Sequence, residues 1–335
     1  MRIHYGVLSQ GQGHLNRSAE LIRAMRARGH QVDVLVAGDS PPAYAKRALG
    51  DFEFLSLPNL ALENGRLRYR RTARRFVGSL PQRALAVSRL ARNFARHRVD
   101  LVVSDWEPIT AWAACLARAP SAGIAGQYRM TRTDAVGPSA PVDRALTLGL
   151  IESWTPGLSH YFAVSFSPLS ATRPRTKVVP PVVDERVRAL APRRAGFFLA
   201  YLYTYPKERV LAALRGLGRF RVYGLGADEQ HGDVTLCPTD RGSFIDDLAA
   251  CEGVIFNGSF QGVCEAASLG KPVLSIPFSG QYEEAFNAFQ VERAGLGAAA
   301  LRLGREAIAS FVRSARPLPP YQRDGTTEIL SQLGL

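Results

Sequence analysis

The chain has little cysteine and no long apolar segment. Its 335 residues include four cysteines, which show neither C-x-x-C spacing nor nearby histidines, so no disulfide framework and no zinc site are expected. No run of about 18 apolar residues occurs, which argues against a membrane-spanning helix. Residues 1–8 lead directly into an expected strand and lack the apolar core of a secretory signal, so a cytoplasmic location is predicted.

Lysine is also scarce, and arginine supplies nearly all of the positive charge. The formal net charge is +13, and only four of the 42 basic residues are lysines. Eleven arginines lie between Arg66 and Arg98, an interval without acidic residues. Because arginine binds phosphate in a bidentate manner, this stretch is expected to meet an anionic membrane surface or a phosphate-bearing acceptor. A solvated helix face is the alternative, and nucleic acid is a less favoured partner.

The composition is that of a soluble protein with more than one core. Hydrophobic residues make up 46% of the chain and charged residues 21%, as in globular proteins, and the length suffices for two domains. Strand-length apolar runs alternate with helical periodicity, which predicts β-α-β units and parallel sheets. A proline- and arginine-rich stretch near residues 180–194 predicts a linker. We therefore expect one domain over residues 1–182 and another over residues 183–316.

The most informative motif runs from Gly253 to Gly295. The apolar run 253–256 predicts a buried strand, which breaks at residues 257–262 and opens a short helix. Small residues let backbone N–H groups approach an oxyanion, and the amino-terminal end of a helix favours negative charge. Glu265 follows within the helix, where its carboxylate can accept hydrogen bonds from a sugar diol. Residues 273–276 predict the next buried strand.

This motif resembles the donor-binding signature of glycosyltransferases of the GT-B class. The most similar members are bacterial proteins that resemble the peptidoglycan N-acetylglucosaminyltransferase, and plant UDP-glycosyltransferases are more distant. The resemblance covers nearly the whole chain and is strongest at residues 253–295 and 6–17. It implies an α/β fold with two facing Rossmann-like domains, parallel sheets and an interdomain cleft. It also implies that the tail, residues 317–335, crosses back to the first domain.

The resemblance assigns donor-binding residues by position. In the family signature, a glycine and serine loop holds the UDP pyrophosphate, a helix glutamate holds the ribose, and an acid–glutamine pair contacts the donor sugar. Glu265 would therefore bind the ribose, and Gln281 with Glu283 or Glu284 would bind the sugar. The remaining donor-binding residues would be Gly13, Ser243, Phe244, Asn257, Gly258, Ser259, Gln261 and Gly262. Asn257 departs from the histidine of the plant enzymes, which places more weight on the backbone amides.

The resemblance also assigns residues of the first domain. His14, which follows a glycine loop, matches the general base of the plant enzymes, and an imidazole with an unperturbed pKa of about 6.5 suits that task. Asp105 matches the aspartate that orients this base. Either residue could instead cap its helix, and Glu107 is a second candidate for the aspartate's role. Gln127 and Tyr128 would border the acceptor pocket.

Together these residues imply an inverting glycosyltransferase that moves a sugar from a UDP-sugar to an acceptor hydroxyl. The acceptor would be lipid-linked, a glycan or a small molecule. The chain lacks the D-x-D motif that holds the metal in the other major glycosyltransferase fold, so no essential metal and no cofactor are expected. Alternatives are a UDP-sugar 2-epimerase of the same fold, a DNA-directed glycosyltransferase and a non-catalytic sugar-nucleotide sensor. Peripheral contact with the inner face of the membrane is the alternative to a purely cytoplasmic location.

Overall fold

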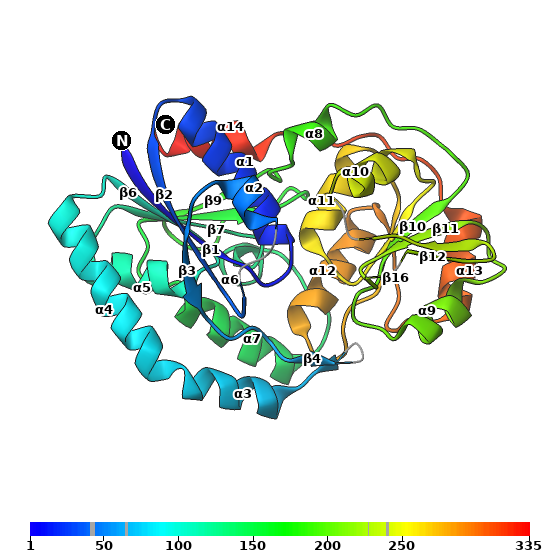
Figure 1. Cartoon of the computed structure of the whole chain (residues 1–335), viewed down its shortest axis with the longest axis horizontal. Helices are drawn as coiled ribbons and strands as arrows, with labels where there is room; N and C mark the ends of the chain where they lie inside the picture. Colours follow the sequence, from blue (N-terminus) through cyan, green and yellow to red (C-terminus); the bar gives the residue numbers. More distant parts are fainter. Residues whose placement is uncertain (41–43, 64–65, 227, 239–240) are drawn as a thin grey trace.

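Two seven-stranded sheets, each covered by helices, form the two halves of the molecule (Figure 1). The computed structural model describes residues 1–40, 44–63, 66–226, 228–238 and 241–335. The α/β class and the two facing Rossmann-like domains that the sequence predicts are confirmed.

The first sheet is parallel throughout and has the order β3-β2-β1-β6-β7-β8-β9. Its strands are β1 (Arg2–Leu8), β2 (Gln31–Gly38), β3 (Glu53–Ser56), β6 (Leu101–Asp105), β7 (Ser121–Ala125), β8 (His160–Val164) and β9 (Thr176–Val179). Successive residues of one strand pack on opposite faces of the sheet. Val103 belongs to the hydrophobic core on one face, and Val102 belongs to the core on the other face. Burial on both faces explains why these strands read as continuous apolar runs.

The second sheet has the order β12-β13-β11-β10-β14-β15-β16. Its strands are β10 (Phe198–Tyr201), β11 (Phe220–Tyr223), β12 (Glu229–His231), β13 (Val234–Leu236), β14 (Val254–Phe256), β15 (Val273–Ser275) and β16 (Gly297–Ala299). The sheet departs from the expected parallel arrangement at one edge, where β12 pairs antiparallel with β13. A two-residue turn joins these strands, and Gly232 supplies its positive φ of 66°.

Helices cover both sheets. Those of the first domain are α1 (Gly13–Ala27), α2 (Ala45–Leu49), α3 (Tyr69–Gly78), α4 (Leu80–His97), α5 (Pro108–Ala117), α6 (Tyr128–Arg132) and α7 (Pro141–Trp154). Those of the second are α9 (Lys207–Leu214), α10 (Arg241–Ala250), α11 (Phe260–Ser268), α12 (Tyr282–Arg293) and α13 (Arg305–Ser314). A small hairpin of β4 (Leu62–Glu63) and β5 (Arg66–Leu67) precedes α3. Among the described residues, no helix combines the length and apolarity that crossing a membrane requires.

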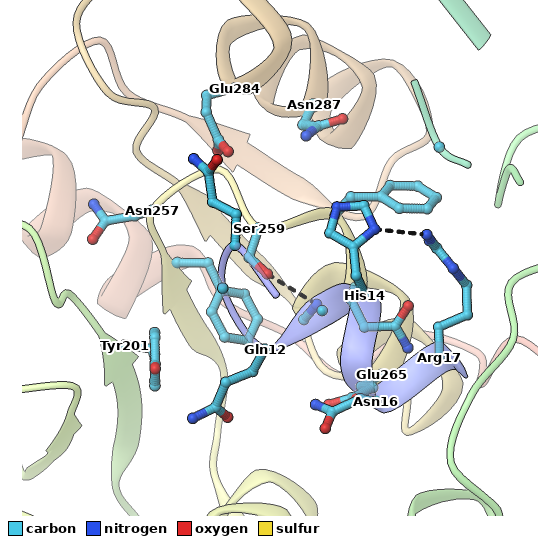
Figure 2. A pocket seen from close by; sticks show the side chains of 18 of the residues that line it. Gln12, His14, Asn16, Arg17, Tyr201, Asn257, Ser259, Glu265, Glu284 and Asn287 are labelled. Atoms are coloured by element: carbon cyan, nitrogen blue, oxygen red, sulfur yellow. Dashed lines mark hydrogen bonds between the residues drawn. The ribbon is translucent and has the colours of Figure 1, made fainter. Parts of the chain in front are cut away.

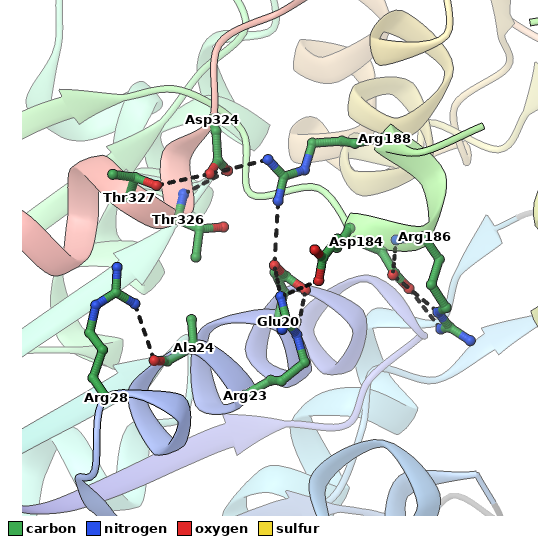
Figure 3. A network of polar contacts seen from close by, with 11 residues as sticks. Glu20, Arg23, Ala24, Arg28, Asp184, Arg186, Arg188, Asp324, Thr326 and Thr327 are labelled. Carbon is green, nitrogen blue, oxygen red and sulfur yellow. Dashed lines mark hydrogen bonds and ion pairs between the residues drawn. The ribbon is translucent and has the colours of Figure 1, made fainter. Parts of the chain in front are cut away.

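The linker and the tail meet on the first domain (Figure 3). The short helix α8 (Glu185–Arg188) follows β9, and the last helix α14 (Gly325–Gln332) packs against α1 and β9, with Ile329 and Leu330 fully buried. Arg188 of α8 lies 3.5 Å from Glu20 of α1 and 3.2 Å from Asp324, which caps α14. Ion pairs thus connect the first helix, the linker and the tail.

Candidate active site

A cavity of about 300 Å³ lies between the two domains (Figure 2). The first domain contributes the loop between β1 and α1, the first turn of α1 and the turn after β7. The second domain contributes the ends of β10 and β14, the start of α11 and the first turns of α12. Both sheets therefore present the carboxyl ends of their strands to one space, which is where open α/β sheets bind ligands.

His14 and Asp105 meet at the wall of this cavity. His14 lies in the first turn of α1 and Asp105 ends β6, which pairs with β1, and the Nδ1 atom of His14 lies 2.8 Å from Oδ1 of Asp105. Asp105 is fully buried, and an ionised carboxylate only accepts hydrogen bonds, so Nδ1 must carry the proton. The lone pair of Nε2 is then left to accept a proton from a bound molecule.

Arg17 completes this cluster, and sequence reasoning missed it. Its Nε donates to Oδ2 of Asp105 at 2.9 Å, and its Nη2 donates to Oδ1. Burial favours protonation of Asp105, but the charge of Arg17 and the hydrogen bond from His14 outweigh it and lower the pKa of Asp105. Because Arg17 follows His14 by three residues in a helix, the spacing itself could have signalled that the two side chains share a face.

Glu107 has a structural task. Its carboxylate accepts hydrogen bonds from the backbone N–H groups of Ile109, at 2.8 Å, and Thr110, at 2.7 Å, and so caps α5. Glu107 is fully buried and does not line the cavity. The prediction that Glu107 could orient the histidine is therefore wrong, and the cap that we had considered for Asp105 belongs to Glu107.

The loop before α11 forms the opposite wall. Ser259 caps α11, since its Oγ accepts a hydrogen bond from the N–H of Gly262 at 3.1 Å. Other first-turn N–H groups have no acceptor within a helix, so they are available to an anion. Gly13 brings this wall close to His14, because a Cβ on Gly13 would lie 3.0 Å from Cβ of Gln261. The amide of Gln261 itself donates to the carbonyl of Val182 at 2.9 Å.

Two carboxyl groups enter the cavity from the first turn of α12. Glu283 accepts a hydrogen bond from Nε2 of Gln127 at 2.8 Å, whereas Oε2 of Glu284 is buried without a hydrogen-bond partner among the described residues. Desolvation raises the pKa of Glu283, and the interactions of Glu283 with His14 and Arg129 partly offset this rise. Desolvation, and then the charge of Glu283, raise the pKa of Glu284 well above its ordinary value.

An aromatic group lines the remaining side of the cavity. The rings of Tyr201, at the end of β10, and Phe244, in α10, lie 5.9 Å apart at an interplanar angle of 84°. Tyr203 adds a third ring 5.6 Å from Tyr201. Phe244 was predicted from the sequence, whereas Tyr201 was not. Glu265 also lines the cavity, about one turn into α11.

Comparison with known proteins identifies the family. The sequence model described as glycosyl transferase family 1 matches residues 1–316. The chain belongs to glycosyl transferase family 1. No curated protein matches it.

Several solved structures resemble this family 1 chain. The calicheamicin glycosyltransferase CalG4 is 18% identical, with a TM-score of 0.60 over 94% of this chain and 90% of that chain. The glycosyltransferase SnogD from Streptomyces nogalater is 18% identical, with a TM-score of 0.54 over 100% and 98%. UGT2 of Phytolacca americana is 14% identical, with a TM-score of 0.64 over 99% and 93%. At these identities the likeness shows the fold, which is the GT-B fold that the motif implied.

The cavity of the family 1 glycosyltransferase corrects some predicted site residues. Tyr128 is 1% exposed and its hydroxyl donates to Thr155 at 2.8 Å, because α6 begins there and turns the ring into the core. Its predicted contact with an acceptor is therefore wrong. Gln281 precedes α12 and does not line the cavity, so the adjacent carboxyl groups of Glu283 and Glu284 stand where the acid–glutamine pair was expected.

Other predicted donor residues of the glycosyltransferase differ in their placement. Asn257, Ser259, Gln261, Gly262 and Gly13 line the cavity. Gly258 has a φ of +63°, faces the carboxyl group of Glu284 and does not line the cavity. Ser243 is exposed on α10 and does not line the cavity either.

The arginine-rich stretch of the glycosyltransferase forms α3 and α4 on the rim of the first domain (Figure 1). Part of its charge is neutralised by acids outside the stretch, since Arg68 pairs with Glu63, Arg75 with Asp39, and Arg89 with Glu53. Arg83 lies over the rings of Phe76 and Trp154. Arg66 is described by its backbone alone. A membrane, phosphate or nucleic-acid partner for this stretch stays a prediction.

Proposed function

We propose that this glycosyltransferase moves a sugar from a UDP-sugar to a hydroxyl of a small-molecule acceptor, with inversion at the anomeric carbon. The hydrogen bond of 2.8 Å between His14 and Asp105, inside the cavity that also holds the start of α11, carries this proposal. Two similar structures support the choice of donor, since UGT2 of Phytolacca americana is complexed with UDP-2-fluoro-glucose and pterostilbene and LpCGTa with UDP.

The acceptor hydroxyl donates a hydrogen bond to Nε2 of His14. As its oxygen attacks the anomeric carbon from the face opposite UDP, the proton passes to Nε2 and the bond from the anomeric carbon to the UDP oxygen breaks. UDP leaves with the electron pair of that bond. The imidazolium that forms is stabilised by Asp105, in the manner of the hydrolase triads.

The second domain supplies the donor site. The diphosphate lies against the first turn of α11, where N–H groups and the helix dipole stabilise the charge that grows on the leaving group. Glu265 accepts hydrogen bonds from the ribose, and the rings of Tyr201 and Phe244 face the uracil. Glu283 and Glu284 contact the sugar. Because the helix terminus already meets the diphosphate, no metal is required in this scheme.

Replacing His14 tests the proposal. For His14→Ala we expect kcat to fall by about 10²–10⁴-fold, since general base catalysis is removed, while UDP binding measured by calorimetry is retained. His160→Ala, an exposed histidine at the start of β8, is the matched control and should keep full activity. An unimpaired kcat in His14→Ala would remove His14 from the mechanism. The UDP-sugar incubated with enzyme alone should stay unchanged by NMR, whereas an epimerase would convert it.

A further inference from the structure

Arg17 is buried in contact with both members of the histidine–aspartate pair. Its side chain is 3% exposed, and its guanidinium forks over both oxygens of Asp105. Nη2 also lies 3.1 Å from Nδ1 of His14, the contact drawn as a dashed line in Figure 2. Since Nδ1 donates its proton to Asp105, this contact places two donor groups side by side on one carboxylate oxygen.

This arrangement changes the charge balance of the pair. Without Arg17, a neutral histidine beside an ionised aspartate would carry a net charge of −1 in a buried place, which draws a proton to the imidazole. With Arg17 the three groups are neutral in sum while the imidazole is neutral. Protonation of the imidazole then gives these three groups a net charge of +1 in a largely buried place, which is costly.

The other ionisable groups around the pair do not replace Arg17. Burial raises the pKa of Cys264 in α11 to about 12, and burial also raises the pKa of Tyr5 in β1, so both stay neutral near pH 7. Glu283 of α12 interacts by charge with both His14 and Arg129 of α6, and desolvation raises the pKa of Glu283, which limits its negative charge beside the imidazole. Among the residues that the structure describes, Arg17 is the cation within hydrogen-bond distance of the imidazole.

We propose that Arg17 is a positioning residue that holds Asp105 against His14 and keeps the imidazole in its proton-accepting form. The inference rests on the proposed function, because it matters for transfer only if His14 is the base. The planar fork fixes the carboxylate so that Oδ1 faces Nδ1, which selects the tautomer with a free Nε2. The charge of Arg17 opposes protonation of His14 before the acceptor arrives.

Two substitutions separate these effects. In Arg17→Gln the charge is lost, so the imidazole titration of His14 and the acidic limb of the kcat/KM profile should both move to higher pH by about one unit or more. In Arg17→Lys the charge remains but the fork is lost, so the acidic limb should move less and kcat should fall with the donor KM unchanged. Arg28→Gln removes an exposed arginine at the end of the same helix and should change neither quantity.

The titration is followed by NMR of histidine labelled with ¹⁵N, with the His14 signal assigned by its loss in His14→Ala. UDP affinity by calorimetry confirms that each variant is folded. If the His14 titration in Arg17→Gln stays where it is in the unchanged protein, the proposal is overturned whatever the rates. If the titration moves but the acidic limb does not, the assignment of Arg17 stands and His14 is not the base. Should Arg17→Gln fail to fold, an unchanged kcat in Arg17→Lys overturns the proposal.

Discussion

Glu284 carries a buried carboxyl group whose loss of solvation is not compensated. Glu283, next to it, receives a hydrogen bond from Gln127, whereas Oε2 of Glu284 has no partner among the described residues. Desolvation and the charge of Glu283 both raise the pKa of Glu284. In its neutral form this carboxyl group can donate a hydrogen bond to a donor sugar, which the glutamine of the family signature would do with its amide.

Glu284→Gln should therefore stabilise the protein at neutral pH. The pKa of Glu284 in the folded protein lies above the ordinary value of 4.5, which applies to the unfolded chain. Between these two pKa values the folded state binds more protons than the unfolded state, so the protein loses stability as the pH rises through this range. Glutamine removes this loss. Each tenfold difference in proton affinity corresponds to about 1.4 kcal/mol, or roughly 2–4 °C in Tm for a chain of this size.

The measurement is Tm against pH for both proteins. The two curves should meet near pH 4 and diverge above it, with the variant more stable and sugar transfer retained. Glu306→Gln, at an exposed glutamate in α13, is the control. Parallel curves for Glu284→Gln and the unchanged protein would show that folding does not raise the pKa of Glu284.

Side-chain direction limits what the sequence predicts at this scale. His14 and Asp105 could be paired because His14 follows β1 and Asp105 ends β6 at the same edge of one sheet. Tyr128 also follows such a strand, but α6 turns its ring toward Thr155 in the core. The position of a residue in a motif thus predicted that it lies at the edge of the sheet. Which of these side chains reach the cavity depends on packing.

At the scale of elements, α5 depends on its cap. Glu107 accepts hydrogen bonds from the N–H groups of Ile109 and Thr110, and all three residues are buried. For Glu107→Ala we expect a loss of about 2 kcal/mol or more in the free energy of unfolding, since two buried donors lose their acceptor.

Urea unfolding measures this loss, and the KM values of the folded enzyme should not change because Glu107 does not line the cavity. Glu208→Ala is the control, since Glu208 is exposed in the first turn of α9. This substitution should change the free energy of unfolding by less than about 0.5 kcal/mol. If Glu107→Ala kept full stability but lost most of its sugar transfer, Glu107 would have a role in catalysis.

Periodicity predicted the elements that bury apolar residues. The predicted strands at 253–256 and 273–276 correspond to β14 and β15 within one residue at each end. The edge strand β12 reads Glu-Gln-His and has no apolar alternation, since it pairs on one side only and faces solvent. Helix α6 follows β7 closely, and Arg129 in this helix donates to Asn287 of the second domain at 2.7 Å.

At the scale of the whole molecule, polar contacts across the cleft fix how the domains face each other. Gln127 donates to Glu283, and Gln290 of α12 donates to the carbonyl of Val136 at 2.6 Å. These contacts join residues 156 and 154 positions apart, respectively, so no local pattern could predict them. The contacting residues belong to different domains, and the cavity is lined by residues of both domains.

Arg188 of the linker should stabilise that placement through its ion pairs with α1 and with the tail. It pairs with Glu20, whose side chain is 5% exposed, and with Asp324, whose carboxylate also accepts from the N–H of Thr326 at 3.0 Å. Arg188→Met keeps the aliphatic stem but leaves Glu20 with Arg23 alone and weakens the hold of the linker on the tail. Because Arg188 is about one-third exposed, we expect a loss of about 1 kcal/mol.

Thermal unfolding at low and high salt measures this loss. Salt screens partly exposed pairs, so the difference in Tm between Arg188→Met and the unchanged protein should shrink at about 1 M salt. Arg313→Met removes an exposed arginine from α13 and should leave Tm unchanged at both salt concentrations. If Arg188→Met lowers Tm equally at both, the loss comes from packing of the linker, and the ion pairs do not hold the tail against the first domain.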